Sequence, residues 1–157
     1  MTEIAFHFNV PDKLGYSCRL LRKAHLTGAQ LVVTGAPELL AELDQLLWTF
    51  SAQEFVPHFR MSASLKSDTA HGNTAHGKAL AATPVLLVDS PRGCAHSGVL
   101  VNLGSHVPDE FERFERFIEV VTTSEADRLA ARQRWKHYAD RGYALKRHDL
   151  AATGDGT

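Results

Sequence analysis

The sequence predicts an α/β domain in which helices flank a mainly parallel central sheet. Three observations support this fold class. Short apolar runs at 31–33, 84–88 and 99–103 have the composition of strands that are covered on both faces. Segments with helical spacing of their apolar residues alternate with such strands, and the connections between them are short. Alternation of this kind is typical of strand–helix–strand units with parallel pairing.

The first strand and first helix follow from two different spacings. Residues 4–8 alternate apolar and other residues, which predicts a half-buried strand. The segment from Asn9 to Asp12 breaks this pattern and starts a helix that Gly28 ends. The strand should direct Ile4, Phe6 and Phe8 to one face, and the helix should direct Leu14, Cys18 and Leu21 to one side.

A second helix follows the strand at 31–33. Pro37 suits the first position of a helix, and the helix should end near Trp48. Its leucines, all expected to face the core, are Leu39, Leu40, Leu43, Leu46 and Leu47.

The middle of the chain combines one short extended piece with a low-complexity segment. Residues 55–59 predict a third strand, whereas residues 62–82 are rich in Ser, Thr, Ala, Gly and His without apolar periodicity. We expect a flexible loop over 62–82, because such a segment cannot bury enough apolar area to offset its ordering entropy. The prediction is one domain over 1–150, with a disordered tail over 151–157.

Two further elements precede the end of the chain. Pro108 is expected to begin a helix in which Phe111, Phe114 and Ile118 face inward. Within 117–121 the chain should become a strand again.

A final helix is predicted from Ser124 to Arg141. Ser124 and Asp127 have the spacing of a capping box, acidic residues occupy the first turn, and Gly142 follows the last turn. Arg128, Arg132 and Trp135 stand at i, i+4 and i+7 and therefore share one face.

Two interpretations of this helix remain open. If Ala126 and Ala130 face the core, Trp135 lies outward beside two guanidinium groups, a surface suited to an acidic peptide end. Alternatively, a stripe of Ala131, Trp135 and Tyr138 buries the indole, as is usual for large aromatic residues.

Composition restricts the class of protein. The chain of 157 residues has a formal net charge of −1, so any electrostatic function must come from local patches. Cys18 and Cys94 fall in no metal or redox motif, which indicates free thiols in a reducing cytoplasm. No apolar run is long enough to span a bilayer and no signal peptide is recognised, so a soluble cytoplasmic protein is expected.

Motifs for catalysis or cofactor binding were not recognised. The turn after the first strand lacks the glycines that hold phosphates at a helix N-terminus, so no nucleotide cofactor is expected. His71, His76, Cys94 and His96 are the only candidate metal ligands, and two of them fall in the low-complexity segment, so no metal is expected. Asp89 at a strand end has no recognisable catalytic partner, and the chain is not expected to be an enzyme.

Several segments together resemble one known family. These are Phe6-His7-Phe8, the block from Leu43 to Trp48 followed by 55–58, the strand Leu100–Leu103, and Arg134-Trp135-Lys136 with Tyr138, Gly142 and Tyr143. Their order and spacing resemble the chi subunit of bacterial DNA polymerase III holoenzyme over most of the chain. The resemblance implies a Rossmann-like fold without nucleotide-binding motifs and a non-catalytic accessory role in the clamp-loader assembly. The family links that assembly to single-stranded DNA-binding protein.

The resemblance also implies two binding surfaces. By alignment of the last helix, the residues that bind the acidic C-terminal tail of single-stranded DNA-binding protein are Val121, Arg128, Arg132 and Trp135. The block presented to the psi subunit, or to a helicase partner, carries Trp48, Phe55 and Pro57. These residues could equally pack between a helix and a strand. Little direct DNA contact and no membrane contact are expected. A small α/β enzyme and a nucleic-acid-binding module remain the alternatives.

Overall fold

The computed structural model describes residues 2–49, 58–61, 84–89, 96 and 98–149. The predicted flexible loop over 62–82, the predicted disordered tail over 151–157, and the candidate ligands His71, His76 and Cys94 lie outside these residues.

A seven-stranded sheet in the order β3-β4-β2-β5-β6-β1-β7 forms the centre of the protein, and every pair of neighbouring strands is parallel. The strands are β1 (Glu3–Val10), β2 (Leu31–Thr34), β3 (His58–Met61), β4 (Val85–Val88), β5 (Val99–Asn102), β6 (Arg116–Thr122) and β7 (Leu145–Asp149). The predicted α/β fold class with a parallel sheet is confirmed.

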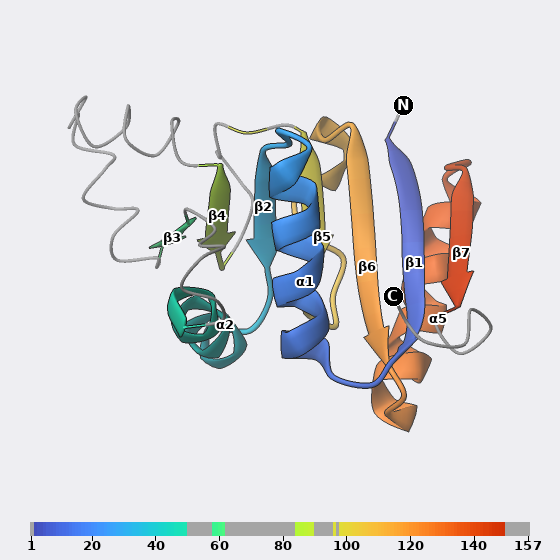
Figure 1. Cartoon of the computed structure of the whole chain (residues 1–157). Coiled ribbons are helices and arrows are strands. Elements are labelled where there is room, and N and C mark those ends of the chain that lie inside the picture. Colours follow the sequence, from blue (N-terminus) through green and yellow to red (C-terminus); the bar gives the residue numbers. More distant parts are fainter. Residues whose placement is uncertain (1, 50–57, 62–83, 90–95, 97, 150–157) are drawn as a thin grey trace.

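Helices cover both faces of the sheet. Figure 1 shows α1 (Lys13–Leu26) and α2 (Pro37–Thr49) on the face toward the viewer, and α5 (Glu125–Asp140) behind β1 and β7. Of the helices described, none is long and apolar enough to cross a membrane.

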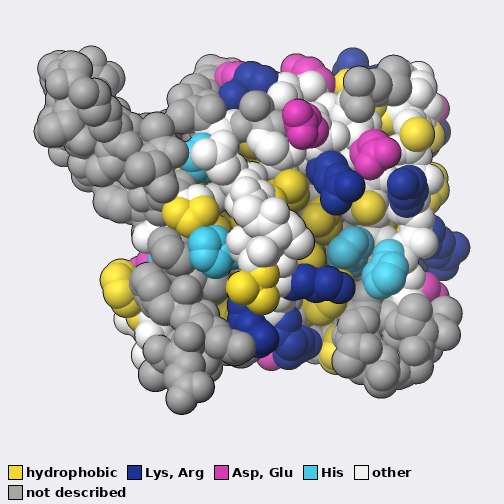
Figure 2. Space-filling view, turned by 45° about the horizontal axis from the view of Figure 1, so that its top comes forward, with side chains coloured by type: hydrophobic (Ala, Val, Ile, Leu, Met, Phe, Trp, Pro, Cys, Tyr) yellow, Lys and Arg dark blue, Asp and Glu magenta, His cyan; other side chains and the backbone are white. Residues whose placement is uncertain are grey.

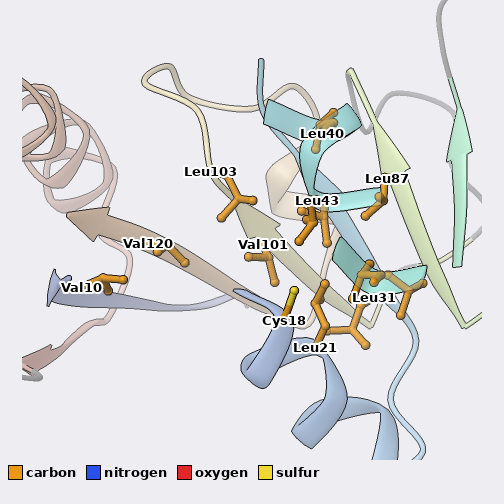
Figure 3. Close-up of a cluster of buried hydrophobic side chains, with 13 residues drawn as sticks. Val10, Cys18, Leu21, Leu31, Leu40, Leu43, Leu87, Val101, Leu103 and Val120 are labelled. Atoms are coloured by element: carbon orange, nitrogen blue, oxygen red, sulfur yellow. The ribbon is translucent and has the colours of Figure 1, made fainter. Parts of the chain in front are cut away.

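The core consists of two clusters, one on each face. The α1 and α2 helices contribute Cys18, Leu21, Leu40 and Leu43 to one cluster, where they meet strand residues such as Val10 and Val101 (Figure 3). Aromatic residues dominate the other, where Ile4, Phe6, Phe117, Ala131 and Tyr138 are fully buried. Alternate residues of β2, β4, β5 and β6 enter opposite clusters, which is the period of two expected for strands covered on both sides.

Most predicted elements are confirmed, with small shifts at their ends. β1 continues to Val10 instead of ending before Asn9, and its pairing with β6 is irregular between His7 and Val10. Asn9 has a φ of 61°, a left-handed conformation that asparagine tolerates, so the irregularity is absorbed at this residue. Pro37 begins α2 as predicted.

The helix predicted from Pro108 is wrong. Residues Phe111–Arg113 form a single turn of 3₁₀ helix, and β6 begins at Arg116. Phe111 and Phe114 are buried as expected, because a spacing of three suits a 3₁₀ turn as well as an α-helix. Ile118 lies on a strand and packs against the α1 and α2 cluster, whereas its neighbour Phe117 faces the aromatic cluster.

Candidate functional site

The α5 helix is fixed to the sheet by its acidic first turn. Asp127 Oδ2 accepts hydrogen bonds from the backbone N–H and the hydroxyl of Thr122, both at 2.9 Å, and lies 3.3 Å from Lys13 Nζ. Burial alone would raise the pKa of Asp127, but the bonds from Thr122 and the charge of Lys13 lower it below its ordinary value. The predicted capping box is wrong in its details, because Ser124 is the N-cap residue but makes no side-chain cap bond.

The inner face of α5 differs from the predicted one. Ala126 is exposed and Ala130 is only half-buried, whereas Ala131, Arg134 and Tyr138 are buried. The prediction that the first two alanines face the core is therefore wrong. The alternative stripe is correct for Ala131 and Tyr138, and partly correct for Trp135, which is half-buried against the aromatic cluster.

A buried polar network holds this inner face. Arg134 Nε lies 2.9 Å from Glu119 Oε2, and its Nη1 donates to the carbonyl of Ser105 at 3.0 Å. Glu119 also accepts hydrogen bonds from the Tyr138 hydroxyl at 2.6 Å and from Asn102 Nδ2 at 2.9 Å. Burial raises the pKa of Glu119, whereas the charge of Arg134 and the hydrogen bonds from Tyr138, Arg134 and Asn102 oppose that effect. The network fixes the rotation of α5 about its axis. Trp135, the residue after Arg134, therefore points toward the rim of the sheet.

At that rim, the three predicted residues of α5 line one pocket. Arg128, Arg132 and Trp135 surround a hollow of about 370 Å³ together with Phe8 and Asn9 of β1 and Arg147 of β7. The two α5 arginines are exposed. Within the described part of the chain, the guanidinium groups of Arg128 and Arg132 form no ion pair. As far as the described residues go, the pocket is therefore a basic site whose α5 arginines lack an acidic partner, and one of its sides is aromatic.

Aromatic contacts fix the position of the indole. The ring of Trp135 lies 5.0 Å from that of Phe6 and 6.2 Å from that of Phe8, both tilted, and Phe6 stacks on Phe8 at 5.6 Å. Such tilted or offset arrangements are favourable for aromatic pairs. One edge of the indole is thus held by the core, and the remainder lines the pocket.

The fourth predicted tail-binding residue, Val121, is placed differently. It is fully buried in the aromatic cluster and is not among the residues that line the pocket. Phe8, Asn9 and Arg147 were not predicted as site residues. No local sequence pattern connects them to α5, because parallel pairing of β1 with β7 brings them there.

A second surface surrounds Trp48 at the end of α2. Its side chain is 61% exposed, and its ring meets that of His58 edge-on at 5.1 Å. With Leu14, Leu46 and the polar residues Glu42, Gln45 and Thr49, it borders a shallow hollow of about 470 Å³. The other two residues predicted for this surface, Phe55 and Pro57, lie outside the described residues.

The described surface carries another hollow, at the carboxyl ends of the central strands. This hollow of about 340 Å³ lies beyond β2, β4 and β5, where ligands commonly bind in parallel sheets, and Asp89 and Asp109 contribute to its lining. Among the described residues, no group of three or more His, Cys, Asp or Glu side chains could hold a metal ion. On the face in Figure 2, basic, acidic and histidine side chains lie close to one another.

Comparisons with known proteins agree on one family. The family described as DNA polymerase III chi subunit, HolC, matches residues 1–146. The DNA polymerase III subunit chi of Pseudomonas aeruginosa is 33% identical over 156 residues, with 96% of this chain and 98% of that protein covered. The subunit of the same name from Haemophilus influenzae is 24% identical over 135 residues, with 85% of each chain covered.

One solved structure shows the same fold at low identity. The C-terminal domain of S. cerevisiae Dbp5, determined in a complex with Gle1 and IP6, superposes with a TM-score of 0.63 at 12% identity. The match covers 94% of this chain and 90% of that one. At this identity the likeness concerns the arrangement of strands and helices alone.

Proposed function

The chain belongs to the DNA polymerase III chi subunit family, and from this premise we propose that it links the clamp-loader assembly to single-stranded DNA-binding protein. Family membership makes it a subunit of the DNA polymerase III complex that takes part in DNA replication. In the proposed role it has no catalytic step of its own. It binds the acidic C-terminal tail of single-stranded DNA-binding protein.

The observation that carries this proposal is the convergence of Arg128, Arg132 and Trp135 on one pocket. Guanidinium groups bind carboxylates through paired hydrogen bonds, and two of them occur here without an ion pair to any described residue. The half-buried indole supplies apolar area for the last side chain of the tail. An acidic peptide that ends in an apolar residue matches both features.

The role of Val121 in this proposal is indirect. Because it is fully buried, it can support the indole through the aromatic cluster but cannot touch a ligand in the described conformation. Direct contact is therefore assigned to the three α5 residues.

Binding should be weak and reversible. A pocket of about 370 Å³ accommodates only a few residues of a peptide, well below the area that a stable protein–protein interface buries. Exposed charges contribute modestly and are screened by salt. Such a contact suits a tether that must release and rebind while the polymerase advances.

The second surface, around Trp48, is proposed to bind the psi subunit or a psi-like protein, or alternatively a helicase. The large exposed indole beside Leu14 and Leu46 supports this assignment, because exposed apolar patches often mark interfaces. Trp48→Ala should lower recovery of that partner from purified components and leave tail binding unchanged. Equal recovery by the variant would remove the assignment.

Fluorescence polarisation with a labelled acidic peptide that ends in Phe tests the tail-binding role. Arg132→Ala or Trp135→Ala should each weaken binding by about 1–3 kcal/mol, the usual cost at interface anchors, which is roughly 5- to 150-fold. Lys136→Ala is the matched control, since this exposed cation lies on the same helix outside the pocket. Circular dichroism confirms that each variant is folded. Unchanged affinity in both variants would discard the pocket.

A supporting experiment separates tethering from direct DNA binding. Recruitment of this protein to single-stranded DNA coated with single-stranded DNA-binding protein should disappear when the tail of the coating protein is deleted. Recruitment that persists, with a steep dependence on salt, would indicate a nucleic-acid-binding module instead.

A further inference from the structure

One wall of the α5 pocket comes from the edge of the sheet, where β1 and β7 lie side by side. Arg147 lies on β7 and, among the described residues, is the only cation that lines this pocket from outside α5. It lies one residue beyond the segment 1–146 that the chi family matches. The position of Arg147 in the structure, not the family match, is the ground for assigning it a role.

The strand places Arg147 on the same side of the sheet as α5. β7 pairs in parallel with β1, so that Leu145, Arg147 and Asp149 stand opposite Ile4, Phe6 and Phe8. The first two of these β1 residues belong to the aromatic cluster under α5, and Phe8 packs against it. Side chains of neighbouring strands in register point to the same face, which directs Arg147 toward the pocket.

Two contacts near the end of β7 hold this wall in position. The guanidinium carbon of Arg147 lies 5.2 Å from the centre of the Phe8 ring, within the range of a cation–π interaction. Asn9 Nδ2 donates a hydrogen bond to Asp149 Oδ1 at 2.7 Å and joins the ends of β1 and β7. Phe8, Asn9 and Arg147 thus form a continuous wall opposite the α5 arginines.

The pocket has more positive charges than are needed to balance one carboxylate. Arg128 and Arg132 approach from the helix and Arg147 from the sheet, and none of the three forms an ion pair within the described residues. One bidentate guanidinium balances the charge of a single carboxylate. Three guanidinium groups on two walls suit a ligand with more than one negative group.

We propose that Arg147 is an anion-binding residue of this pocket, and that the pocket holds two separate carboxylates of an acidic peptide. The arginines of α5 bind one carboxylate, and Arg147 of β7 binds the other. This inference rests on the proposed function, because it assumes that an acidic peptide end is the ligand. It adds a residue that sets specificity: a peptide with one carboxylate would engage only one of the two walls.

A double-mutant cycle tests the inference. The parent probe is a labelled peptide with several internal Asp residues and a C-terminal Phe with a free carboxylate. A second peptide carries a C-terminal amide, and a third carries Asn in place of every Asp. Each is titrated against the wild type, Arg132→Ala, Arg147→Ala and the control Lys146→Ala. Lys146 is a 70% exposed neighbour whose side chain lies on the opposite face of β7.

With the parent peptide, Arg147→Ala should weaken binding about three- to tenfold, within the range for exposed charge pairs and interface anchors. Lys146→Ala should change binding less than about twofold. For one of the modified peptides, Arg147→Ala should bind as tightly as the wild type. For the other modified peptide, Arg132→Ala should bind as tightly as the wild type. That crossed pattern identifies two carboxylates on two walls.

Two results would overturn the inference and leave the proposed function intact. One is wild-type affinity in Arg147→Ala while Arg132→Ala binds weakly. The other is loss of both penalties with the same modified peptide, which would mean a single anion subsite. Wild-type affinity in both variants would remove the proposed function as well.

Discussion

Arg134 and Trp135 are adjacent in sequence, yet Arg134 is 2% exposed beneath α5 and bonded to Glu119, whereas Trp135 lines the pocket at the rim of the sheet. The buried ion pair sets the rotation of the helix about its axis. The exposed pocket depends on that rotation, and the two residues must therefore be considered together.

We predict that Arg134→Met destabilises the fold by about 3–5 kcal/mol, because it leaves the enclosed Glu119 carboxylate without its charge partner. Urea denaturation followed by far-UV circular dichroism measures the loss. Gln133→Ala, an exposed neighbour on the same helix, should change the free energy of unfolding by less than about 0.5 kcal/mol. A loss below about 1 kcal/mol in Arg134→Met would show that the pair is not important for stability.

The stability of the fold should fall below pH 6.5 in part through His7. Burial, with the nearby His148 as a second cause, lowers the pKa of His7 to about 4. Between pH 6.5 and about 4 the unfolded chain binds a proton at this position and the folded chain does not, so acidification favours unfolding. Protonation at this position lowers the free energy of unfolding by about 1–3 kcal/mol, and this loss is complete near pH 4 and absent above pH 7. His7→Gln should flatten the decline of unfolding free energy over this range, and an identical profile in the variant would contradict the assignment.

Peptide binding should weaken as salt rises. Arg128 and Arg132 are exposed, and the Debye length shortens from about 10 Å at 0.1 M to 3 Å at 1 M. We expect affinity to fall about three- to tenfold between roughly 0.05 M and 0.5 M NaCl. Arg132→Ala should show a shallower dependence in the same titration. Binding that is insensitive to salt would indicate that apolar contact with Trp135 dominates.

Tryptophan emission should report peptide docking from one indole only. The sequence contains two tryptophans, and Trp48→Phe leaves Trp135 as the sole indole. A docked peptide excludes water from the half-buried ring of Trp135, so its emission should shift to shorter wavelength on titration. Trp135→Phe, which retains Trp48, should show no shift with the same peptide. A response in that second variant would place the ligand near α2 instead.

Sequence patterns predicted the order of the elements as far as α5, because those strands and most helices carry local signals, whereas β7 (Leu145–Asp149) was not predicted. Buried strands at 31–33 and 84–88 are continuous apolar runs, and α5 has acids in its first turn and Gly142 with a φ of 85° after its last. The segment after Pro108 was misassigned because Phe111 and Phe114 are spaced as in a helix. Alternation over 116–122, with Phe117, Glu119 and Val121 on one face, was the competing signal.

The candidate site was predictable only in its helical part. Spacing along one helix brings Arg128, Arg132 and Trp135 together, so their common face followed from the sequence. The burial of Arg134 with Glu119 did not follow, since charged side chains are rarely buried unless paired and the partner is on another element. Arg147 was not identified because its place in the pocket depends on tertiary pairing.

The interleaving of the first and last strands has a consequence for biosynthesis. β1 lies between β6 and β7 in the sheet. It therefore has no strand to pair with until these two neighbours, more than a hundred residues later in the chain, have been translated. The contact between Phe8 and Arg147 forms only after β7 has been translated. A nascent or prematurely terminated chain therefore lacks the complete pocket and should not compete with finished molecules for their ligand.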